Sequence, residues 1–299
     1  MQLSDRKYFI SGSSGFVGTA ILDFLGEEKF YLLKRGSEIK IKHEVVVFHL
    51  AGKAHDLKNI STPEEYYQVN TELTKKVFDA FLASDAKVFI TLSSVKAVAD
   101  QVKGELSEEY HPNPITHYGK SKLLAEEYIL SKELPNYKRV YILRPCMIHG
   151  PGNKGNLNLL YKIVSKNIPW PLGAFHNQRS FCSIDNLLFI IKELIERDDI
   201  PSGLYNVADD DPLSTNELVS LIAESLNRKP IFWQLSEGFI KSLARFGDKL
   251  YLPLNSERLQ KLTDSYEVSN KKIKNALKIE KFPVSARDGL LKTIKSFVK

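Results

Sequence analysis

The run Lys7-Tyr-Phe-Ile-Ser11, followed at once by Gly12-Ser-Ser-Gly15-Phe-Val-Gly18, decides the fold of this 299-residue chain. The first five residues form a short apolar run typical of a strand, and the segment from Thr19 to Leu25 has the pattern of a helix. A strand, a glycine turn and a helix in this order begin a βαβ unit that binds a dinucleotide. In such a unit the first glycine permits the tight turn and the second lets a pyrophosphate approach the helix N-terminus. The third glycine lets the helix pack closely on the strand.

Strands and helices continue to alternate beyond this unit. Thr62 and Pro63 suit the N-cap and the first turn of the longest helix, which carries an apolar stripe. Alternation of this kind predicts an α/β fold with a doubly wound parallel sheet. The predicted strands are 7–11, 30–33, 44–50, 87–93, 139–143 and 203–207, and the predicted helices are 19–25, 63–83, 117–131, 214–228 and 236–247.

Three side chains form a candidate proton-handling site. Tyr118 and Lys122 are four residues apart in the predicted helix 117–131, so they share one face of it. A cation close to a phenol lowers its pKa, which suits the pair to moving a hydroxyl proton. Ser94 follows the predicted strand 87–93, at the end of a parallel strand where ligands bind. Taken singly, these residues also fit a solvated helix face and a strand-end turn.

Further motifs are Leu143-Arg-Pro145 with Gly150-Pro-Gly152, His49-Leu-Ala-Gly52, and Arg179-Ser-Phe-Cys-Ser-Ile-Asp185-Asn-Leu. Together with the glycine turn, they resemble the extended branch of the short-chain dehydrogenase/reductase superfamily. Within it the chain is similar to the UDP-glucose 4-epimerase-like proteins of the NAD-dependent epimerase/dehydratase family. The resemblance covers nearly the whole chain and implies NAD(P)-dependent chemistry on a nucleotide-activated sugar, with Ser94, Tyr118 and Lys122 as the catalytic triad.

The resemblance also assigns binding roles to individual residues. Arg179 would hold the substrate's diphosphate, because a guanidinium matches phosphate oxygens in pairs. The implied substrate-binding residues are Lys53, Ser94, Asn156 and Arg179, and His55 could line the same pocket. The implied cofactor-binding residues are Gly12, Ser14, Gly15, Phe16, Val17, Gly18, Arg35, Leu50, Ala51, Gly52, Asn70, Ser93, Tyr118, Lys122 and Pro145. No metal site is implied.

The segment after the second predicted strand departs from the family pattern. Lys34-Arg35 stands where a carboxylate usually binds the ribose 2′-hydroxyl, and an arginine there can accept a 2′-phosphate instead. This favours NADP(H) as the cofactor, although a solvated basic turn explains the same residues. Residues 35–44 are also too few to hold the family's usual further strand.

The implied mechanism makes Tyr118 exchange the proton of a sugar hydroxyl, usually the one at C4. Lys122 would lower the pKa of Tyr118 and bind the nicotinamide ribose, while Ser94 would orient the hydroxyl. The expected reaction is C4 epimerisation of a UDP-hexose or UDP-N-acetylhexosamine. An NADPH-dependent 4-keto-sugar nucleotide reductase would use the same three residues. A non-catalytic NADP-sensing relative would have no need to retain them.

The resemblance implies two structural parts and a partner. A Rossmann domain would comprise residues 1–150 plus about 181–208, and a substrate-binding lobe about 151–180 and 209–299. The helix pair 63–83 and 117–131 builds a dimer in the family, so a homodimer is expected by analogy. The amphipathic segment Phe239–Phe246 is interpreted as lobe core, the alternative being a membrane-surface anchor.

Composition fits a soluble, cytoplasmic enzyme. The chain is 43% hydrophobic and 26% charged, and its net charge of +6 comes from scattered lysines without a nucleic-acid-binding motif. It has neither an apolar run of membrane-spanning length nor the apolar core of a signal peptide. Cys146 and Cys182 lack any ligand spacing around them, so we expect neither a disulfide nor a metal site.

Overall fold

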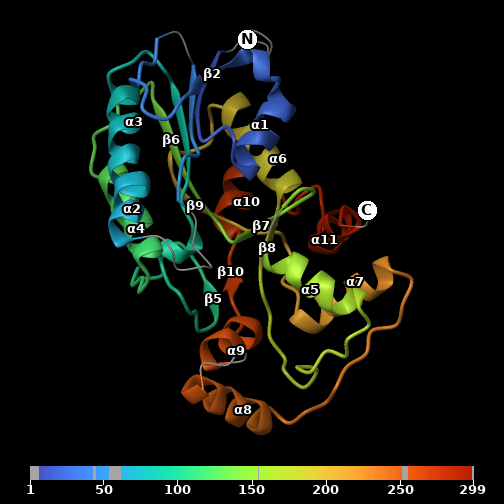
Figure 1. Ribbon diagram of the computed structural model, residues 1–299. Helices are drawn as coiled ribbons and strands as arrows, with labels where there is room; N and C mark the ends of the chain where they lie inside the picture. The colour runs from blue at the N-terminus through green and yellow to red at the C-terminus, as the bar shows by residue number, and fades with distance from the viewer. Residues whose placement is uncertain (1–6, 43–44, 54–61, 154, 251–254, 298–299) are drawn as a thin grey trace.

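The computed structural model describes residues 7–42, 45–53, 62–153, 155–250 and 255–297, and a six-stranded sheet forms its centre (Figure 1). In spatial order its strands are β2 (Phe30–Leu33), β1 (Tyr8–Ser11), β3 (Val46–His49), β4 (Val88–Leu92), β6 (Arg139–Pro145) and β9 (Gly203–Val207). Every neighbouring pair is parallel. The strand order reverses between β1 and β3, and dinucleotides bind beyond the strand ends at such a point.

Helices cover both faces of this sheet (Figure 1). α1 (Phe16–Leu25) and α6 (Ile184–Glu196) pack on one face, and α3 (Leu73–Leu82) and α4 (His117–Leu130) pack on the other. Side chains alternate along each strand, so Tyr8 and Ile10 enter the first core while Phe9 enters the second. The predicted α/β fold with a doubly wound parallel sheet is confirmed.

The predicted helix 63–83 forms, but its middle is a turn of π-helix. α2 (Pro63–Tyr66) leads into the π-helical segment Tyr67–Glu72, which continues as α3. Within this segment the Asn70 side chain accepts the Lys53 N–H at 2.7 Å and donates to the Lys53 carbonyl at 3.1 Å. The wider turn therefore directs Asn70 to the loop that follows β3, and π turns often occur at functional sites.

A second group of helices lies beside the lower end of the sheet in Figure 1. It packs around its own hydrophobic core, which includes Leu160, Ile222 and Leu290. Two short parallel pairs accompany it: β7 (Met147–His149) with β8 (Phe181–Ser183), and β5 (Glu105–Leu106) with β10 (Glu267–Val268). The helices are α5 (Asn156–Ser165), α7 (Thr215–Ser225), α8 (Glu237–Leu250), α9 (Ser256–Thr263) and α11 (Ala286–Lys295).

α10 (Lys271–Leu277) departs from this grouping. It packs against β9, and its side chains Ile273 and Leu277 join the core of α1 and α6. A chain segment inside the predicted lobe thus contributes to the core of the sheet. The division into a Rossmann domain and a substrate-binding lobe stays a prediction.

α8 buries only part of its apolar surface. Ile240 and Ala244 belong to the second core, whereas Phe239, Leu243 and Phe246 are 58%, 43% and 55% exposed. The interpretation of this segment as lobe core is wrong for the last three, because they lie on the helix flank beside the buried one. Among the described residues, no helix has both the length and the hydropathy that a bilayer crossing requires.

Candidate active site

The turn between β1 and α1 has the conformation that a dinucleotide site needs. Gly12 has a φ of +79°, and a Cβ on it would lie 2.4 Å from the backbone nitrogen of Ala51. A Cβ on Gly18 would lie 2.2 Å from the Gly12 carbonyl oxygen. The tight turn and the close helix packing predicted from the sequence are therefore both present.

The N-terminus of α1 can receive an anion. Gly15 is its N-cap, no side chain caps the helix, and its first turn holds no acidic residue. The first N–H groups of any helix have no acceptor inside the helix, and here they belong to Phe16, Val17 and Gly18. Ser14 and Gly15 are exposed. Because anions bind at such termini, this turn fits the pyrophosphate of a dinucleotide.

The loop after β3 joins the glycine turn to the predicted triad. The Leu50 N–H donates to the Ser11 carbonyl at 3.0 Å, which holds the loop against β1. A Cβ on Gly52 would lie 3.0 Å from Lys122 Nζ and 3.3 Å from Asn70 Oδ1. The structure thus brings Gly52, Asn70 and Lys122 together at the end of the sheet where β1 and β3 finish.

Ser94 and Tyr118 are in direct contact, because the Ser94 hydroxyl hydrogen-bonds the Tyr118 phenol. Ser94 follows β4 and begins the 3-10 turn Val95–Ala97, and its Oγ also accepts the Lys96 N–H at 3.2 Å. Tyr118 is the second residue of α4. Two of the predicted triad residues therefore meet across elements that are separated in the sequence.

The start of α4 is held by hydrogen bonds between side chains and its backbone and by close packing on this turn. Thr116 is the N-cap, and its Oγ1 accepts the Gly119 N–H at 3.2 Å. Asp100 Oδ2 accepts the Thr116 N–H at 3.2 Å. Gly119 permits the close approach, since a Cβ on it would lie 2.3 Å from the Lys96 carbonyl oxygen. These contacts determine where Tyr118 enters the site.

The electrostatics of the pair differ from the sequence expectation. Burial raises the pKa of Tyr118, and the hydrogen bond with Ser94 opposes that rise. The expectation that Lys122 lowers the Tyr118 pKa is wrong for this structure, because Nζ of Lys122 is directed to the end of β4, where it donates to the Leu92 carbonyl at 2.9 Å. Burial lowers the pKa of Lys122 to about 8, and the negative charge of Glu126 partly offsets this.

A buried ion pair lies one helical turn beyond Lys122. The side chains of Glu126 and Arg144 are 2% and 5% exposed, and Arg144 Nε donates to Glu126 Oε1 at 2.9 Å. Arg144 Nη2 donates to the other carboxylate oxygen, so the contact is bidentate. Glu126 was not predicted from the sequence, although its position four residues after Lys122 on one helix face was an available signal.

A small cavity adjoins Lys122. Asn70, Ser93 and Glu126 are among its lining residues. The Ser93 Oγ is buried and has no hydrogen-bond partner within the described ranges. An unsatisfied hydroxyl at this edge of the sheet fits a residue that contacts a bound cofactor.

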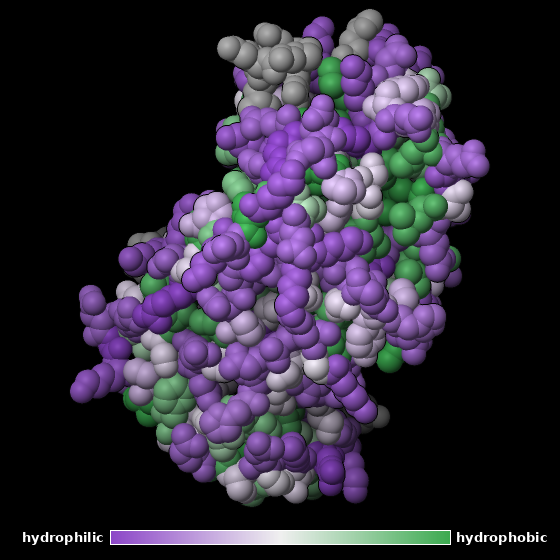
Figure 2. Space-filling model, turned by 180° about the vertical axis from the view of Figure 1, so that it is seen from behind, coloured by the Kyte–Doolittle hydropathy of each residue, from purple (hydrophilic) through white to green (hydrophobic). Residues whose placement is uncertain are grey.

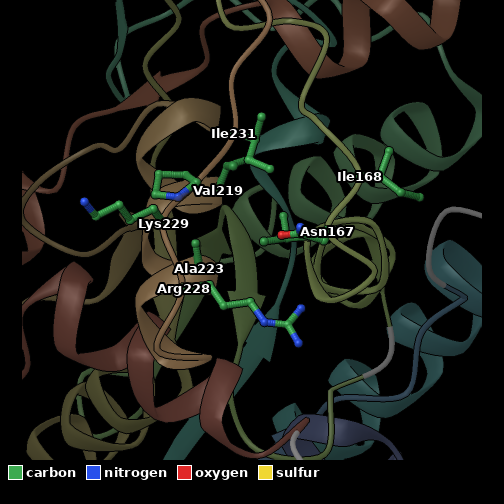
Figure 3. Close-up of a pocket in the computed structure, with 9 residues that line it drawn as sticks. Asn167, Ile168, Val219, Ala223, Arg228, Lys229 and Ile231 are labelled. Carbon is green, nitrogen blue, oxygen red and sulfur yellow. The ribbon is translucent and has the colours of Figure 1, made fainter.

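A second hollow, shown in Figure 3, lies between the end of α5 and the end of α7. Asn167, Val219, Arg228 and Ile231 are among the residues that line it, and none of the predicted site residues does. The described residues contain no group of three or more His, Cys, Asp or Glu side chains that could hold a metal ion.

Arg179 is linked to the turn at Ser94 through Tyr266. The backbone of Arg179 pairs with that of Tyr266, and the Tyr266 hydroxyl donates to the carbonyls of Val95 at 3.2 Å and Ala99 at 2.7 Å. Burial lowers the pKa of the Arg179 guanidinium. The predicted diphosphate residue is thus connected, through Tyr266, to the turn that begins at Ser94.

Lys53 is linked to Tyr118 by the aromatic side chain of Tyr66, which was not predicted from the sequence. It forms an ion pair with Glu65, and its ammonium lies 5.8 Å from the centre of the Tyr66 ring. The Tyr66 ring meets the Tyr118 ring edge to face, with centroids 6.3 Å apart. No local sequence pattern indicated Tyr66, because its contact with the Tyr118 ring depends on the packing of α2 on α4.

The remaining predicted residues keep their roles as predictions. Arg35 is exposed after β2, Pro145 is buried at the end of β6, and Asn156 is the first residue of α5. His55 lies outside the described residues. His149, which lies between Pro145 and Gly150, is fully buried and hydrogen-bonds Thr293 at 2.9 Å.

Comparison with known proteins identifies the family. The model described as the NAD dependent epimerase/dehydratase family matches residues 8–208. The chain belongs to this family. The resemblance seen in the sequence is confirmed, and the protein is an enzyme of the NAD-dependent epimerase/dehydratase type.

Three relatives of this chain are named for different activities. UDP-glucose 4-epimerase of Vibrio cholerae is 30% identical over 100% of this chain and 99% of the relative. N-acetyl-alpha-D-glucosaminyl-diphospho-ditrans,octacis-undecaprenol 4-epimerase of Escherichia coli O157:H7 is 31% identical over 73% of this chain and 72% of the relative. GDP-6-deoxy-D-mannose reductase of Pseudomonas aeruginosa is 24% identical over 73% of this chain and 80% of the relative.

A solved structure shares the fold. UDP-N-acetylglucosamine 4-epimerase from Bacillus cereus aligns with a TM-score of 0.75, covers 98% of both chains and is 17% identical. At this identity the likeness shows the epimerase/dehydratase fold alone.

Proposed function

We propose that this protein interconverts the C4 epimers of a nucleotide-activated sugar, a UDP-hexose or a UDP-N-acetylhexosamine. The observation that carries the proposal is the hydrogen bond between Ser94 and Tyr118 at the end of β4, with Lys122 on the same helix. A phenol, a hydroxyl and a cation beside a dinucleotide turn can exchange a hydroxyl proton during hydride transfer. The match to UDP-glucose 4-epimerase over the whole chain supports this sugar class.

In the proposed reaction, ionised Tyr118 accepts the proton of the C4 hydroxyl while the C4 hydrogen leaves with its electron pair. The glycine turn and the loop 50–52 would hold a nicotinamide dinucleotide, which would supply the hydride acceptor and donor. Ser94 donates a hydrogen bond to the C4 oxygen as that oxygen becomes a carbonyl. Return of the hydride to the opposite face of C4, with the proton from Tyr118, gives the epimer.

Lys122 supplies the positive charge that this reaction needs. Its pKa of about 8 keeps it protonated at neutral pH, while burial raises the pKa of Tyr118. The protonated ammonium would bind the nicotinamide ribose, the role that the family resemblance implies for it, while the hydrogen bond with Ser94 opposes the rise in the Tyr118 pKa. Arg179 would bind the diphosphate, and Lys53 and Asn156 would contact the substrate beside it.

The exposed Lys34-Arg35 pair after β2 supports NADP(H) as the preferred cofactor. It also favours a second candidate function, the NADPH-dependent reduction of a 4-keto-sugar nucleotide. The relative named as GDP-6-deoxy-D-mannose reductase supports that candidate. In this reaction Tyr118 donates the proton and the hydride is delivered once. A non-catalytic NADP-sensing role has less support, because such a protein would not need the contact between Ser94 and Tyr118.

A substrate panel separates these functions. The purified protein is given UDP-glucose and UDP-N-acetylglucosamine without added cofactor, and the C4 epimers are measured by chromatography. N-acetylglucosaminyl-diphospho-undecaprenol joins the panel, because a relative's name includes that substrate. NADPH oxidation that depends on a 4-keto-sugar nucleotide would favour the reductase instead. Turnover of neither kind would overturn both proposals.

Tyr118→Phe tests the catalytic assignment within this panel. Turnover should fall roughly 10²–10⁴-fold, the usual contribution of a positioned acid or base, while the cofactor still binds. Tyr128→Phe is the matched control, since the Tyr128 hydroxyl bonds Asp79 at the exposed side of the same helix. Equal rates in Tyr118→Phe and wild type would remove Tyr118 from the mechanism.

We also propose that two copies of the chain pair through α3 and α4. Figure 2 shows hydrophobic side chains gathered at the upper right, on the side of the molecule where these helices lie. Leu124 and Leu130 of α4 are 44% and 58% exposed. Light scattering should report a dimer for the wild type and a monomer for Leu124→Glu with Leu130→Glu. A monomeric wild type would contradict the pairing.

A further inference from the structure

α8 carries two different apolar surfaces. Ile240 and Ala244 face the second core, and Phe239, Leu243 and Phe246 form an exposed line on the neighbouring flank. These three residues recur at the spacing of helical turns, so they make one continuous stripe. Single exposed apolar residues are ordinary, but a line of three large side chains, two of them aromatic, marks an interaction surface.

The charged residues of α8 are segregated from this stripe. Glu237 is bound by Lys241 at 2.7 Å, and Asp248 accepts both the N–H and the hydroxyl of Ser256, at 2.9 and 2.6 Å. At roughly 100° per residue, both carboxylates lie across the helix from the stripe.

Two exposed cations lie nearer to the stripe. Lys249 is about a quarter turn from it by the same helical geometry, and Arg245 follows further round the helix. A surface that meets the stripe therefore meets Lys249 at its margin, Arg245 beyond it, and no carboxylate of this helix. This arrangement is complementary to a negatively charged partner with an apolar interior.

The position of α8 suits a flat surface. It lies at the end of the molecule opposite β2, and α9 packs on it (Figure 1). Its residues, Glu237–Leu250, would extend only about 21 Å at 1.5 Å per residue, too short to cross a bilayer. A helix with one aromatic flank, a basic margin and low overall hydropathy lies in the plane of a membrane interface.

We propose that α8 is a membrane-surface helix that binds this protein to bilayers containing anionic phospholipids. Phe239, Leu243 and Phe246 enter the boundary between headgroups and acyl chains, and Arg245 and Lys249 contact headgroup phosphates. A second copy of the chain fits this surface less well. Pairing of two α8 helices about a two-fold axis parallel to them would place the same cations near each other, and like charges oppose association.

Docking through α8 would bring the substrate segment towards the membrane. α9 packs on α8, and the carbonyl of its residue Leu262 accepts a hydrogen bond from Asn177, two residues before Arg179. Binding to the membrane does not depend on the proposed reaction, so the two can be tested separately.

The experiment is sedimentation of the full-length protein with vesicles. Vesicles of phosphatidylcholine with phosphatidylglycerol should carry the wild type into the pellet, and phosphatidylcholine vesicles should carry much less. The triple variant Phe239→Ser, Leu243→Ser, Phe246→Ser should lose about tenfold or more in partitioning. Arg245→Gln with Lys249→Gln should lose roughly thirtyfold on the anionic vesicles, at the usual contribution per cation.

A matched control removes comparable apolar surface elsewhere. Ile115→Ser with Tyr137→Ser, at positions 73% and 60% exposed, should bind vesicles as the wild type does. Every variant should turn over UDP-sugars in solution at the wild-type rate, since none of these residues belongs to the site. A wild type that stays in the supernatant with anionic vesicles overturns the proposal. An α8 triple variant that still binds anionic vesicles also overturns it. A triple variant whose only defect is the loss of self-association overturns it too.

Discussion

The carboxylate of Glu126 is held by two nitrogens of Arg144, one helical turn beyond Lys122. Both side chains are buried, so the pair places a fixed negative charge behind a lysine whose pKa burial has lowered to about 8. That charge raises the Lys122 pKa and thus helps to keep the ammonium ionised at neutral pH. The ion pair between α4 and β6 is therefore both a structural contact and part of the electrostatics of the site.

Glu126→Gln should affect stability and pH dependence together. The buried Arg144 would lose its counter-ion, which typically costs about 3–5 kcal/mol of unfolding free energy. The Lys122 pKa should fall below about 8, so kcat/KM should decline at a lower pH on the alkaline side than in the wild type. Urea denaturation and a pH–rate profile measure the two effects. Glu127→Gln, at the exposed neighbouring position, should change neither, and an unshifted profile in Glu126→Gln would refute the electrostatic role.

Gly18→Ala should disrupt the dinucleotide turn. Its Cβ would lie 2.2 Å from the Gly12 carbonyl oxygen, so α1 must move away from the strand. We expect at least about tenfold weaker cofactor binding in a fluorescence titration, because the helix N-terminus moves with it. Gly238→Ala meets nothing within 4 Å and should bind the cofactor normally. Normal binding by both variants would show that the turn is not the cofactor site.

His49 should make the protein sensitive to acid. Burial, aided by the charge of Lys122, lowers its pKa to about 3, and its ring bonds Ser11 at 2.7 Å and Thr74 at 2.8 Å. His49 binds a proton more readily in the unfolded chain than in the folded one. The stability that neutral His49 contributes is therefore complete above about pH 6.5 and is lost as the pH falls towards 3. At pH 5 the loss is about 2 kcal/mol.

Urea denaturation at pH 7.5 and pH 5 tests this assignment. The wild type should lose about 2 kcal/mol more between these values than His49→Asn does. His111→Asn, at an exposed position, should keep the wild-type pH dependence. Identical pH dependence in His49→Asn and wild type would mean that another group causes the acid sensitivity.

Arg179→Gln should weaken substrate binding more than it slows chemistry. Loss of a charge-assisted bidentate contact with a diphosphate should raise KM by roughly 10–100-fold. Steady-state kinetics with the active UDP-sugar gives KM and kcat separately. Arg287→Gln removes a surface ion pair with Glu224 and serves as the control. A Arg179→Gln variant with an unchanged KM would show that the diphosphate binds elsewhere.

The sequence predicted the parts of this molecule that depend on local pattern. The strand–glycine–helix unit at Gly12, the alternation of strands and helices, and the spacing of Tyr118 and Lys122 are all readable within short windows. The structure confirms the parallel sheet, and it brings Ser94 and Tyr118 into contact.

Features that depend on distant segments were missed. The bonds of Asn70 to Lys53 join the π turn to a distant loop, and the burial of Glu126 depends on Arg144 in another element. Burial also decides the direction of the Tyr118 pKa shift, which helical spacing alone had suggested wrongly. The exposure of Phe239 follows from which flank of α8 meets the second core, and periodicity cannot choose between two adjacent apolar flanks.

Tyr266 has a consequence for the length of substrate that the protein can accept. Its backbone pairs with Arg179 while its hydroxyl bonds the turn that begins at Ser94, so the two residues keep a constant separation. If Arg179 binds a phosphate and Ser94 contacts the sugar hydroxyl, the separation of these two residues sets the distance between the phosphate and the hydroxyl in a substrate that fits. An activated sugar with one phosphate in place of two would not span it. The protein would then select its substrates by the distance between the sugar hydroxyl and the phosphate, whatever group lies beyond the second phosphate.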